Sequence, residues 1–179
     1  MPVPNSGQKL SAQGLFLDPR AAPLNLVLVQ PQIPPNTGNV ARLCAVTGTR
    51  LHLVAPLGFS IADKDLRRAG LDYWDKVHAA TWASFEELIA SESLEAERVH
   101  LFTGRGATGL WEARFRSGDW LILGDEVVGL PDAALQRFPE RWVRVPMIPD
   151  PSARSLNLST CAGIALYEAL RQIRFAQTG

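Results

Sequence analysis

The sequence has little cysteine, few lysines and no long apolar run. Its two cysteines, Cys44 and Cys161, are far apart and form no C-x-x-C pair. This argues against a disulfide scaffold and favours a reducing compartment, so we expect a cytoplasmic protein with two buried, unreactive thiols. No apolar stretch approaches the roughly 18 residues that a membrane helix needs. We therefore expect no contact with a membrane.

The sequence also lacks net charge, because 18 basic residues balance 18 acidic ones. A nonspecific nucleic-acid coat carries a large positive excess, so that class is excluded. The balance is uneven along the chain, since five glutamates and no basic residue lie between positions 86 and 97. Fifteen of the basic residues are arginines, whose forked side chains suit phosphate. A selective anionic partner is therefore compatible with the composition.

Two parts of the chain differ in composition. Residues 1–23 hold four prolines and two glycines, which predicts a flexible N-terminal extension. From residue 24 onward, apolar runs of four to six residues alternate with helical patterns, which predicts one domain over residues 24–179. Strands are predicted at 24–29, 50–55, 76–80, 98–103, 119–124 and 142–145. Helices are predicted at 37–47, 63–69, 131–138 and 158–175, with another after the Ser84–Glu87 capping box.

Several of these strands are apolar throughout, which is typical of a parallel sheet covered by helices on both faces. The predicted class is therefore α/β. Ligands in such domains bind at the carboxyl ends of the strands, so the loops that follow the strands are the candidate sites.

Two patterns point to alternative functions. Residues 104–109 read G-x-G-x-x-G after a strand, which indicates a dinucleotide site, but the motif follows the fourth predicted strand and the crossover is short for a helix. A glycine-rich wall beside another ligand is the favoured interpretation. A basic residue and an aliphatic residue precede each of the three histidines, His52, His78 and His100. If the three strands were adjacent, their imidazoles would bind zinc. Separately bonded histidines are the favoured interpretation there, and we expect no metal.

Three loops after strands are rich in glycine, asparagine and proline. The first opens a helix at Pro34–Arg42 (PPNTGNVAR), with Asn36 or Thr37 as its expected cap. The second is Gly124–Pro131 (GDEVVGLP), and the third runs from Val145 through the SLNLS segment at 155–159. Three prolines within six residues stiffen the third loop.

These three loops resemble the three signature motifs of the SPOUT RNA methyltransferases. PPNTGN at 34–39, LRRAGLDY at 66–73 and SLNLS at 155–159 look like the small tRNA (cytidine/uridine-34)-2′-O-methyltransferase subgroup. The resemblance covers about residues 24–175, and residues 1–23 have no counterpart. Asp125 stands where relatives often carry proline, and Val128 where an arginine is expected.

The resemblance implies a Rossmann-like parallel-sheet SPOUT fold whose C-terminal segment forms a trefoil knot. It also implies a bent pocket for S-adenosylmethionine, with S-adenosylhomocysteine as the product. Carried over by position, the residues expected to bind this cofactor are Phe102, Thr103, Gly104, Gly124, Glu126, Gly129, Val145, Met147, Ser155 and Leu156.

The implied reaction is methyl transfer to a ribose 2′-hydroxyl at the wobble nucleotide of tRNA. By resemblance, Arg42, Ser155 and Asn157 are the catalytic candidates. Arginine stays protonated in proteins and is an awkward base. We therefore favour Arg42 as a clamp on the adjacent phosphate, assisted by Ser155 or Asn157, with an Arg42 base as the alternative.

The partners implied are tRNA, through its anticodon stem-loop, and a second copy of the chain. Residues expected to face RNA are Asn36, Asn39, Arg42, Arg67, Arg68 and Arg154. Tyr167 on the last helix is expected at the dimer interface, so that the Arg42 loop of one subunit completes the partner's site. The alternatives are a SPOUT enzyme acting on another tRNA or rRNA nucleotide, and a non-catalytic RNA-binding protein.

Overall fold

The computed structural model describes residues 24–60, 77–150 and 155–176. The predicted extension at 1–23 and the predicted helix at 63–69 lie outside these ranges. Arg67, Arg68 and Arg154 lie outside them too. The predicted trefoil knot would involve the chain at 151–154, which is likewise outside the described residues.

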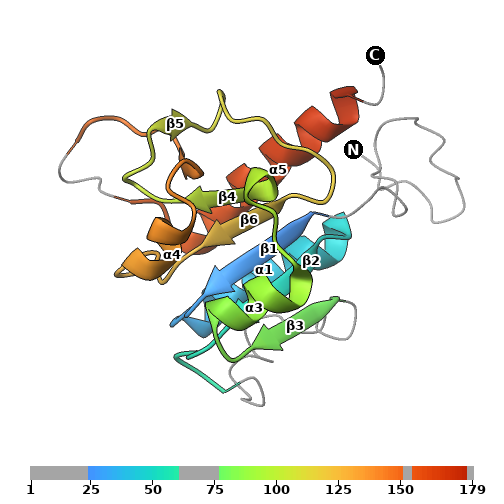
Figure 1. Cartoon of the computed structure of the whole chain (residues 1–179), viewed down its shortest axis with the longest axis vertical. Coiled ribbons are helices and arrows are strands. Elements are labelled where there is room, and N and C mark those ends of the chain that lie inside the picture. The colour runs from blue at the N-terminus through green and yellow to red at the C-terminus, as the bar shows by residue number, and fades with distance from the viewer. Residues whose placement is uncertain (1–23, 61–76, 151–154, 177–179) are drawn as a thin grey trace, which may run out of the picture.

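A parallel sheet of seven strands forms the centre of the molecule, in the order β3-β2-β1-β6-β4-β7-β5 (Figure 1). The strands are β1 Asn25–Val29, β2 Arg50–Val54, β3 Ala79–Trp82, β4 Val99–Phe102, β5 Thr108–Gly109, β6 Trp120–Leu123 and β7 Trp142–Arg144. Every neighbouring pair is parallel, which confirms the predicted class. Six of the strands were expected, and β3 begins three residues later than predicted. β5 was not expected, because two residues at a sheet edge carry no periodic pattern.

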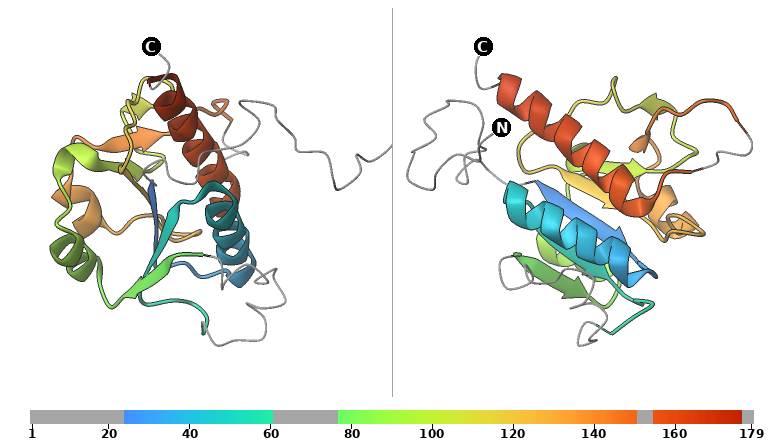
Figure 2. Two further views of the ribbon diagram at one scale, coloured as in Figure 1. Left: turned by 90° about the vertical axis from the view of Figure 1, so that its right-hand side faces the viewer. Right: turned by 180° about the vertical axis from the view of Figure 1, so that it is seen from behind.

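Helices cover both faces of the sheet. They are α1 Pro34–Thr47, α3 Phe85–Glu92, α4 Asp132–Arg137 and α5 Leu158–Ala176, with a short 3-10 turn, η2, at Ala96–Arg98. α1 and α5 contact each other on one face, and α3 and α4 lie on the opposite face (Figure 2). None of the helices within the described ranges is long and apolar enough to span a bilayer.

The apolar strands serve two cores at once. Leu26 and Leu28 of β1 face the core formed with α1 and α5, whereas Val27 and Val29 face the core formed with α3 and α4. Each fully buried side chain of this kind contributes about 1.5–3 kcal/mol by leaving water. This two-sided burial explains why β1 has no polar position after Asn25.

Two of the expected helix ends are confirmed and one is wrong. Gly48 closes α1 in the left-handed conformation, with φ 71°, as glycine allows at such a position. Ser84 Oγ accepts from Glu87 N at 3.1 Å at the start of α3. The start of α1 differs from the prediction, because the helix already begins at Pro34 and neither Asn36 nor Thr37 caps it. Proline at the first turn sets the backbone angle that the helix needs.

The glycine-rich segment after β4 leads into β5 rather than into a helix. Gly106 has a local packing reason: a Cβ there would lie 2.7 Å from the carbonyl carbon of Val143. Since a dinucleotide site needs the start of a helix after its glycines, the dinucleotide alternative is wrong.

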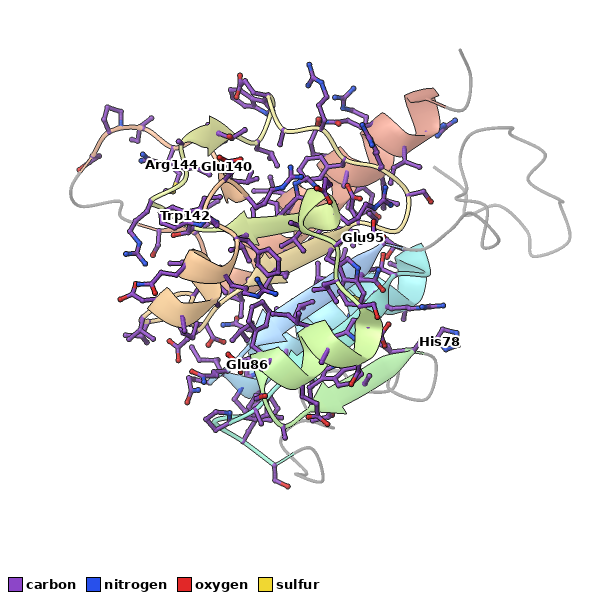
Figure 3. The ribbon with its side chains drawn as sticks, viewed as in Figure 1. His78, Glu86, Glu95, Glu140, Trp142 and Arg144 are labelled. Atoms are coloured by element: carbon purple, nitrogen blue, oxygen red, sulfur yellow. The ribbon has the colours of Figure 1, made fainter. Side chains whose placement is uncertain are left out.

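The three histidines do not form a common site. His52 Nδ1 accepts from Trp82 Nε1 at 3.1 Å, and His100 Nε2 lies 2.9 Å from Asp119 Oδ2. His78 is exposed and projects away from the body of the protein (Figure 3). Within the residues that the structure describes, no three side chains of the metal-binding types come together.

Candidate active site

A chain of hydrogen bonds joins the three loops that the sequence singled out. Asn157 Nδ2, after β7, donates to Asn36 Oδ1, after β1, at 2.9 Å. Asn36 Nδ2 then donates to Glu126 Oε1, after β6, at 3.1 Å. Residues separated by 90 and 121 positions thus meet at the carboxyl edge of the sheet. The predicted convergence of the three loops at this edge is confirmed.

Glu126 caps the start of α1 from a distance. Its Oε2 accepts from Gln32 N at 2.8 Å, and its Oε1 accepts from Ile33 N at 3.1 Å. A carboxylate at a helix N-terminus also faces the positive end of the helix dipole. This long-range cap takes the place that the sequence assigned to Asn36 or Thr37, and it fixes α1 relative to the loop after β6.

Asn157 uses both ends of its amide. Beyond its bond to Asn36, its Oδ1 accepts from Ser159 N at 2.9 Å and from Ser159 Oγ at 2.8 Å. These bonds cap the first turn of α5. Asn157 therefore couples the start of α5 to the start of α1.

The loop after β6 is a tight turn. Asp125 and Gly129 exchange backbone hydrogen bonds of 3.1 and 3.0 Å, and Asp125 Oδ1 accepts from Val127 N at 2.6 Å. A Cβ at Gly124 would lie 2.2 Å from the carbonyl carbon of Gly129, so only glycine fits there. Asp125, which departs from the family pattern, thus closes the turn and leaves Val127 and Val128 exposed.

A cavity of about 230 Å³ opens beside this network. Seven of the ten predicted cofactor residues line it: Phe102, Thr103, Gly104, Val145, Met147, Ser155 and Leu156. A second hollow of about 410 Å³ shares Thr103 and includes Gly129. Gly124 and Glu126 are not among the residues lining either hollow.

Residues 23–167 match the SpoU rRNA Methylase family. The chain belongs to this family. Similar proteins include the tRNA (cytidine(34)-2′-O)-methyltransferase of Burkholderia cenocepacia, 48% identical over 84% of this chain and 96% of the relative. The enzyme of the same name from Escherichia coli K12 is 42% identical over 85% of this chain and 95% of the relative. A solved structure described as giving insights into the 2-OH methylation of C/U34 on tRNA matches with TM-score 0.77 and 48% identity, covering 85% of this chain and 97% of the other.

The hollows fit the cofactor expected for a SpoU family member. The wall of the first cavity is apolar at Phe102, Val145 and Leu156. At Gly104, a Cβ would meet no atom within 4 Å, so the space beside this glycine is open. In the second hollow, Arg105 and Asp132 form an ion pair of 2.8 Å. The two hollows share Thr103 as a lining residue, one being largely apolar and the other polar, which suits a ligand with a purine and a charged amino-acid end.

Sequence reasoning missed two residues of the cavity, Arg144 and Cys161. Arg144 is the last residue of β7, so its position at a strand end was the available signal. Cys161 is half-buried rather than buried, and burial raises its pKa to about 11. Burial raises the pKa of Cys44 to about 12. The predicted burial is therefore confirmed for Cys44 and wrong for Cys161, and both pKa values keep these groups as neutral thiols at neutral pH.

The remaining predicted residues lie around this site or on α5. Arg42 and Asn39 are exposed on α1, one turn apart, while Asn36 is buried within the network. Tyr167 is 54% exposed on α5, and Ile164, one turn before it, is also exposed.

Proposed function

We propose that this protein transfers a methyl group from S-adenosylmethionine to the ribose 2′-hydroxyl of nucleotide 34, C or U, in tRNA. The observation that carries the proposal is the Asn157–Asn36–Glu126 chain, which assembles all three loops beside the cavity. The names of the relatives, which span most of this chain, support the same substrate and the same nucleotide.

The residues around the two hollows would hold the cofactor. Phe102, Gly104, Val145, Met147, Ser155 and Leu156 would form the apolar and backbone wall, with Thr103 and Gly129 toward the second hollow. When bound, S-adenosylmethionine supplies an electrophilic methyl group. Glu126 and Gly124 shape the loop behind this wall in our proposal rather than touching the cofactor.

Arg42 acts in this proposal as a clamp on the phosphate next to the target ribose. Its guanidinium stands on the exposed side of α1, and α1 is fixed at its start by Glu126. A guanidinium that binds phosphate through two N–H groups would fix the position of the ribose hydroxyl. Correct positioning of the reacting groups lowers a large part of the activation barrier in such a transfer.

Ser155 is exposed and lines the cavity, so in this proposal its hydroxyl oxygen accepts a hydrogen bond from the 2′-hydroxyl. As the ribose oxygen takes the methyl group from sulfur, the hydroxyl proton passes to solvent water. Asn157 is a positioning residue, since both ends of its amide are already hydrogen-bonded. Asn36 likewise holds the loop in place from within the network, while Asn39 is exposed toward solvent, where RNA would approach.

The active form in this proposal is a homodimer in the cytoplasm. Ile164 and Tyr167 leave apolar surface exposed on α5, and Val46 does so on the neighbouring α1. A second copy that covered α1 and α5 would bury these exposed side chains. Tyr167→Glu should convert the dimer to a monomer in sedimentation experiments.

The decisive experiment incubates the full chain with S-adenosylmethionine and unmodified tRNA transcripts and maps the methylated nucleotide by mass spectrometry. We expect a 2′-O-methyl group at nucleotide 34, greatly reduced in Arg42→Ala and not rescued by Arg42→Lys, which lacks the fork. Methylation at another nucleotide would instead support the alternative SPOUT substrate. No methylation, together with retained RNA binding, would support the non-catalytic alternative.

A further inference from the structure

Trp111 stands out because its large aromatic side chain is 69% exposed. The structure describes three other tryptophans, Trp82, Trp120 and Trp142, and all of them are buried or half-buried. An exposed indole offers a flat apolar face with a polar N–H edge, which suits contact with another aromatic ring.

The backbone that carries Trp111 is firmly held. Leu110 N donates to Arg144 O at 2.9 Å, and Ala113 N donates to Gly109 O at 3.0 Å. Gln172 of α5 also binds this segment, accepting from Phe115 N at 3.0 Å and donating to Ala113 O at 3.0 Å. Because the backbone is ordered before any partner arrives, binding would cost little further conformational entropy.

The surface around Trp111 is basic. Leu110, Ala113 and Phe115 are buried, and this spacing turns Trp111, Arg114 and Arg116 outward. Arg144 is exposed on the neighbouring strand, while Glu112 is the acid within the same segment. We call Trp111, Arg114, Arg116 and Arg144 the Trp111 edge.

The Trp111 edge adjoins the cavity. Gly109 of β5 is the register partner of Arg144 in β7, and Arg144 lines the cavity. Figure 3 shows Arg144 on the side of the sheet where β5 forms the margin. Trp111 lies two residues beyond Gly109, in the turn that Ala113 N closes on Gly109 O, so it is at most about 7 Å of chain from Gly109. A molecule reaching the cavity from this side therefore passes over the edge.

We propose that Trp111 stacks on an unpaired base of the RNA substrate, while the arginines of the Trp111 edge contact its phosphates. The inference rests on the proposed function for the identity of the substrate. Stacking requires a base that is free of a helix, and an anticodon loop supplies such bases around nucleotide 34. A second copy of this chain is a poor occupant, because two arginine-rich edges would repel each other.

The test measures RNA binding by the full chain without cofactor, using an anticodon stem-loop oligonucleotide and a fully paired duplex of equal length. Stacking on one base typically accounts for a several-fold to hundredfold difference in affinity. We expect Trp111→Ala to weaken stem-loop binding about tenfold and to leave duplex binding unchanged. Trp111→Phe should retain most of the affinity while removing the tryptophan quenching that the RNA causes in the unaltered protein.

Arg137→Ala is the matched control for charge, because Arg137 is exposed on α4, on the opposite face of the sheet. Arg114→Ala should lower the salt dependence of binding, and Arg137→Ala should not. Unchanged stem-loop affinity in Trp111→Ala would overturn the proposal, as would an altered oligomeric mass. If the unaltered protein methylates another nucleotide, the proposed function fails, while the comparison of stem-loop with duplex still tests the stacking.

Discussion

At the amino ends of the strands, Asp119 is buried between His100, at 2.9 Å, and Arg98, at 3.0 Å. At the carboxyl ends, Glu126 is half-buried and binds two backbone amides and the Asn36 side chain. Each carboxylate has more than one partner, but the kinds of partner differ. Asp119 binds groups that belong to its own sheet and to the turn before β6, whereas Glu126 joins loops that follow different strands.

Within one sheet, the Asp119 cluster therefore serves stability, and the Glu126 network serves the candidate active site. Asp119 and His100 are buried and lie against each other, so they offer no surface to a ligand, and removing the carboxylate leaves the charge of Arg98 uncompensated. The Glu126 network borders a cavity and ends at the starts of α1 and α5, and α1 carries the exposed Asn39 and Arg42. We therefore expect changes at the amino ends to alter unfolding, and changes at the carboxyl ends to alter turnover.

The largest effect on stability is expected for Asp119→Ala. It leaves His100 and Arg98 without their carboxylate, and also removes the acceptor for Arg116 N at 2.7 Å. We expect the free energy of unfolding in urea to fall by about 3–5 kcal/mol. At a temperature where the variant is folded, its affinity for S-adenosylhomocysteine should match that of the unaltered protein. If Asp119→Ala unfolded at the same urea concentration as the unaltered protein, Asp119 and its partners would not be a stabilising cluster.

His52, in the middle of β2, should make the stability of the fold sensitive to acid. Burial, with a smaller contribution from Arg50, lowers its pKa from 6.5 to about 4. The indole donor of Trp82 already occupies Nδ1, so the neutral ring fits and the protonated ring does not. The unfolded chain binds a proton below about 6.5 and the folded one only below about 4. The stabilisation is therefore complete above pH 6.5 and is lost as the pH falls toward 4.

Over that window the loss attributable to His52 is about 3 kcal/mol. Urea unfolding at a series of pH values should show it in the unaltered protein. The variant His52→Gln, which cannot titrate, should lose correspondingly less stability between the two limits. Parallel curves for the two proteins would show that His52 is not the responsible group.

At the carboxyl ends, Glu126→Gln tests the long-range cap. The amide keeps the shape but not the charge, so the start of α1 loosens by a few tenths of a kcal/mol to about 1 kcal/mol. Because α1 carries Arg42, we expect turnover on tRNA to fall about tenfold, which corresponds to about 1.4 kcal/mol. Calorimetric affinity for S-adenosylhomocysteine should stay unchanged. A marked loss of that affinity would instead restore the direct cofactor contact that the resemblance implied for Glu126.

The smallest change is expected for Asn157→Ala. It removes the cap of α5 and the bond to Asn36, which should cost about 1 kcal/mol in unfolding free energy. Turnover should fall as well, since the starts of α1 and α5 become uncoupled. Asn157→Ser retains an oxygen that can cap α5 but loses the amide N–H that donates to Asn36 Oδ1. We therefore expect the unfolding free energy of Asn157→Ser to match that of the unaltered protein, while its turnover stays as low as that of Asn157→Ala.

Local patterns were sufficient for much of the fold and of the site. Continuous apolar runs such as LVLV after Asn25 predicted buried parallel strands, and Gly48 predicted the end of α1. The three loops could be placed at one edge because parallel strands end on the same side. Seven cofactor candidates carried over from the resemblance do line a single cavity.

The features that were not predicted depend on contacts between residues far apart in the sequence. The start of α1 was placed too late because its cap, Glu126, lies more than 90 positions further along the chain. β5 exists because Leu110 N and the Gly109–Arg144 register tie the glycine-rich segment to β7. The exposure of Trp111 likewise follows from the burial of its neighbours. No local pattern encodes such pairings.

The order of the strands has a consequence for how the chain is made. β6 lies between β1 and β4, so it joins the β1–β3 half of the sheet to the β4–β7 half. A ribosome-bound chain that ends before Trp120 can pair β1 with β2 and β2 with β3, but β4 then has neither of its sheet neighbours. Its apolar residues stay exposed until β6 emerges. Pulsed proteolysis of arrested nascent chains should show protection of β4 only after the β6 segment has left the exit tunnel.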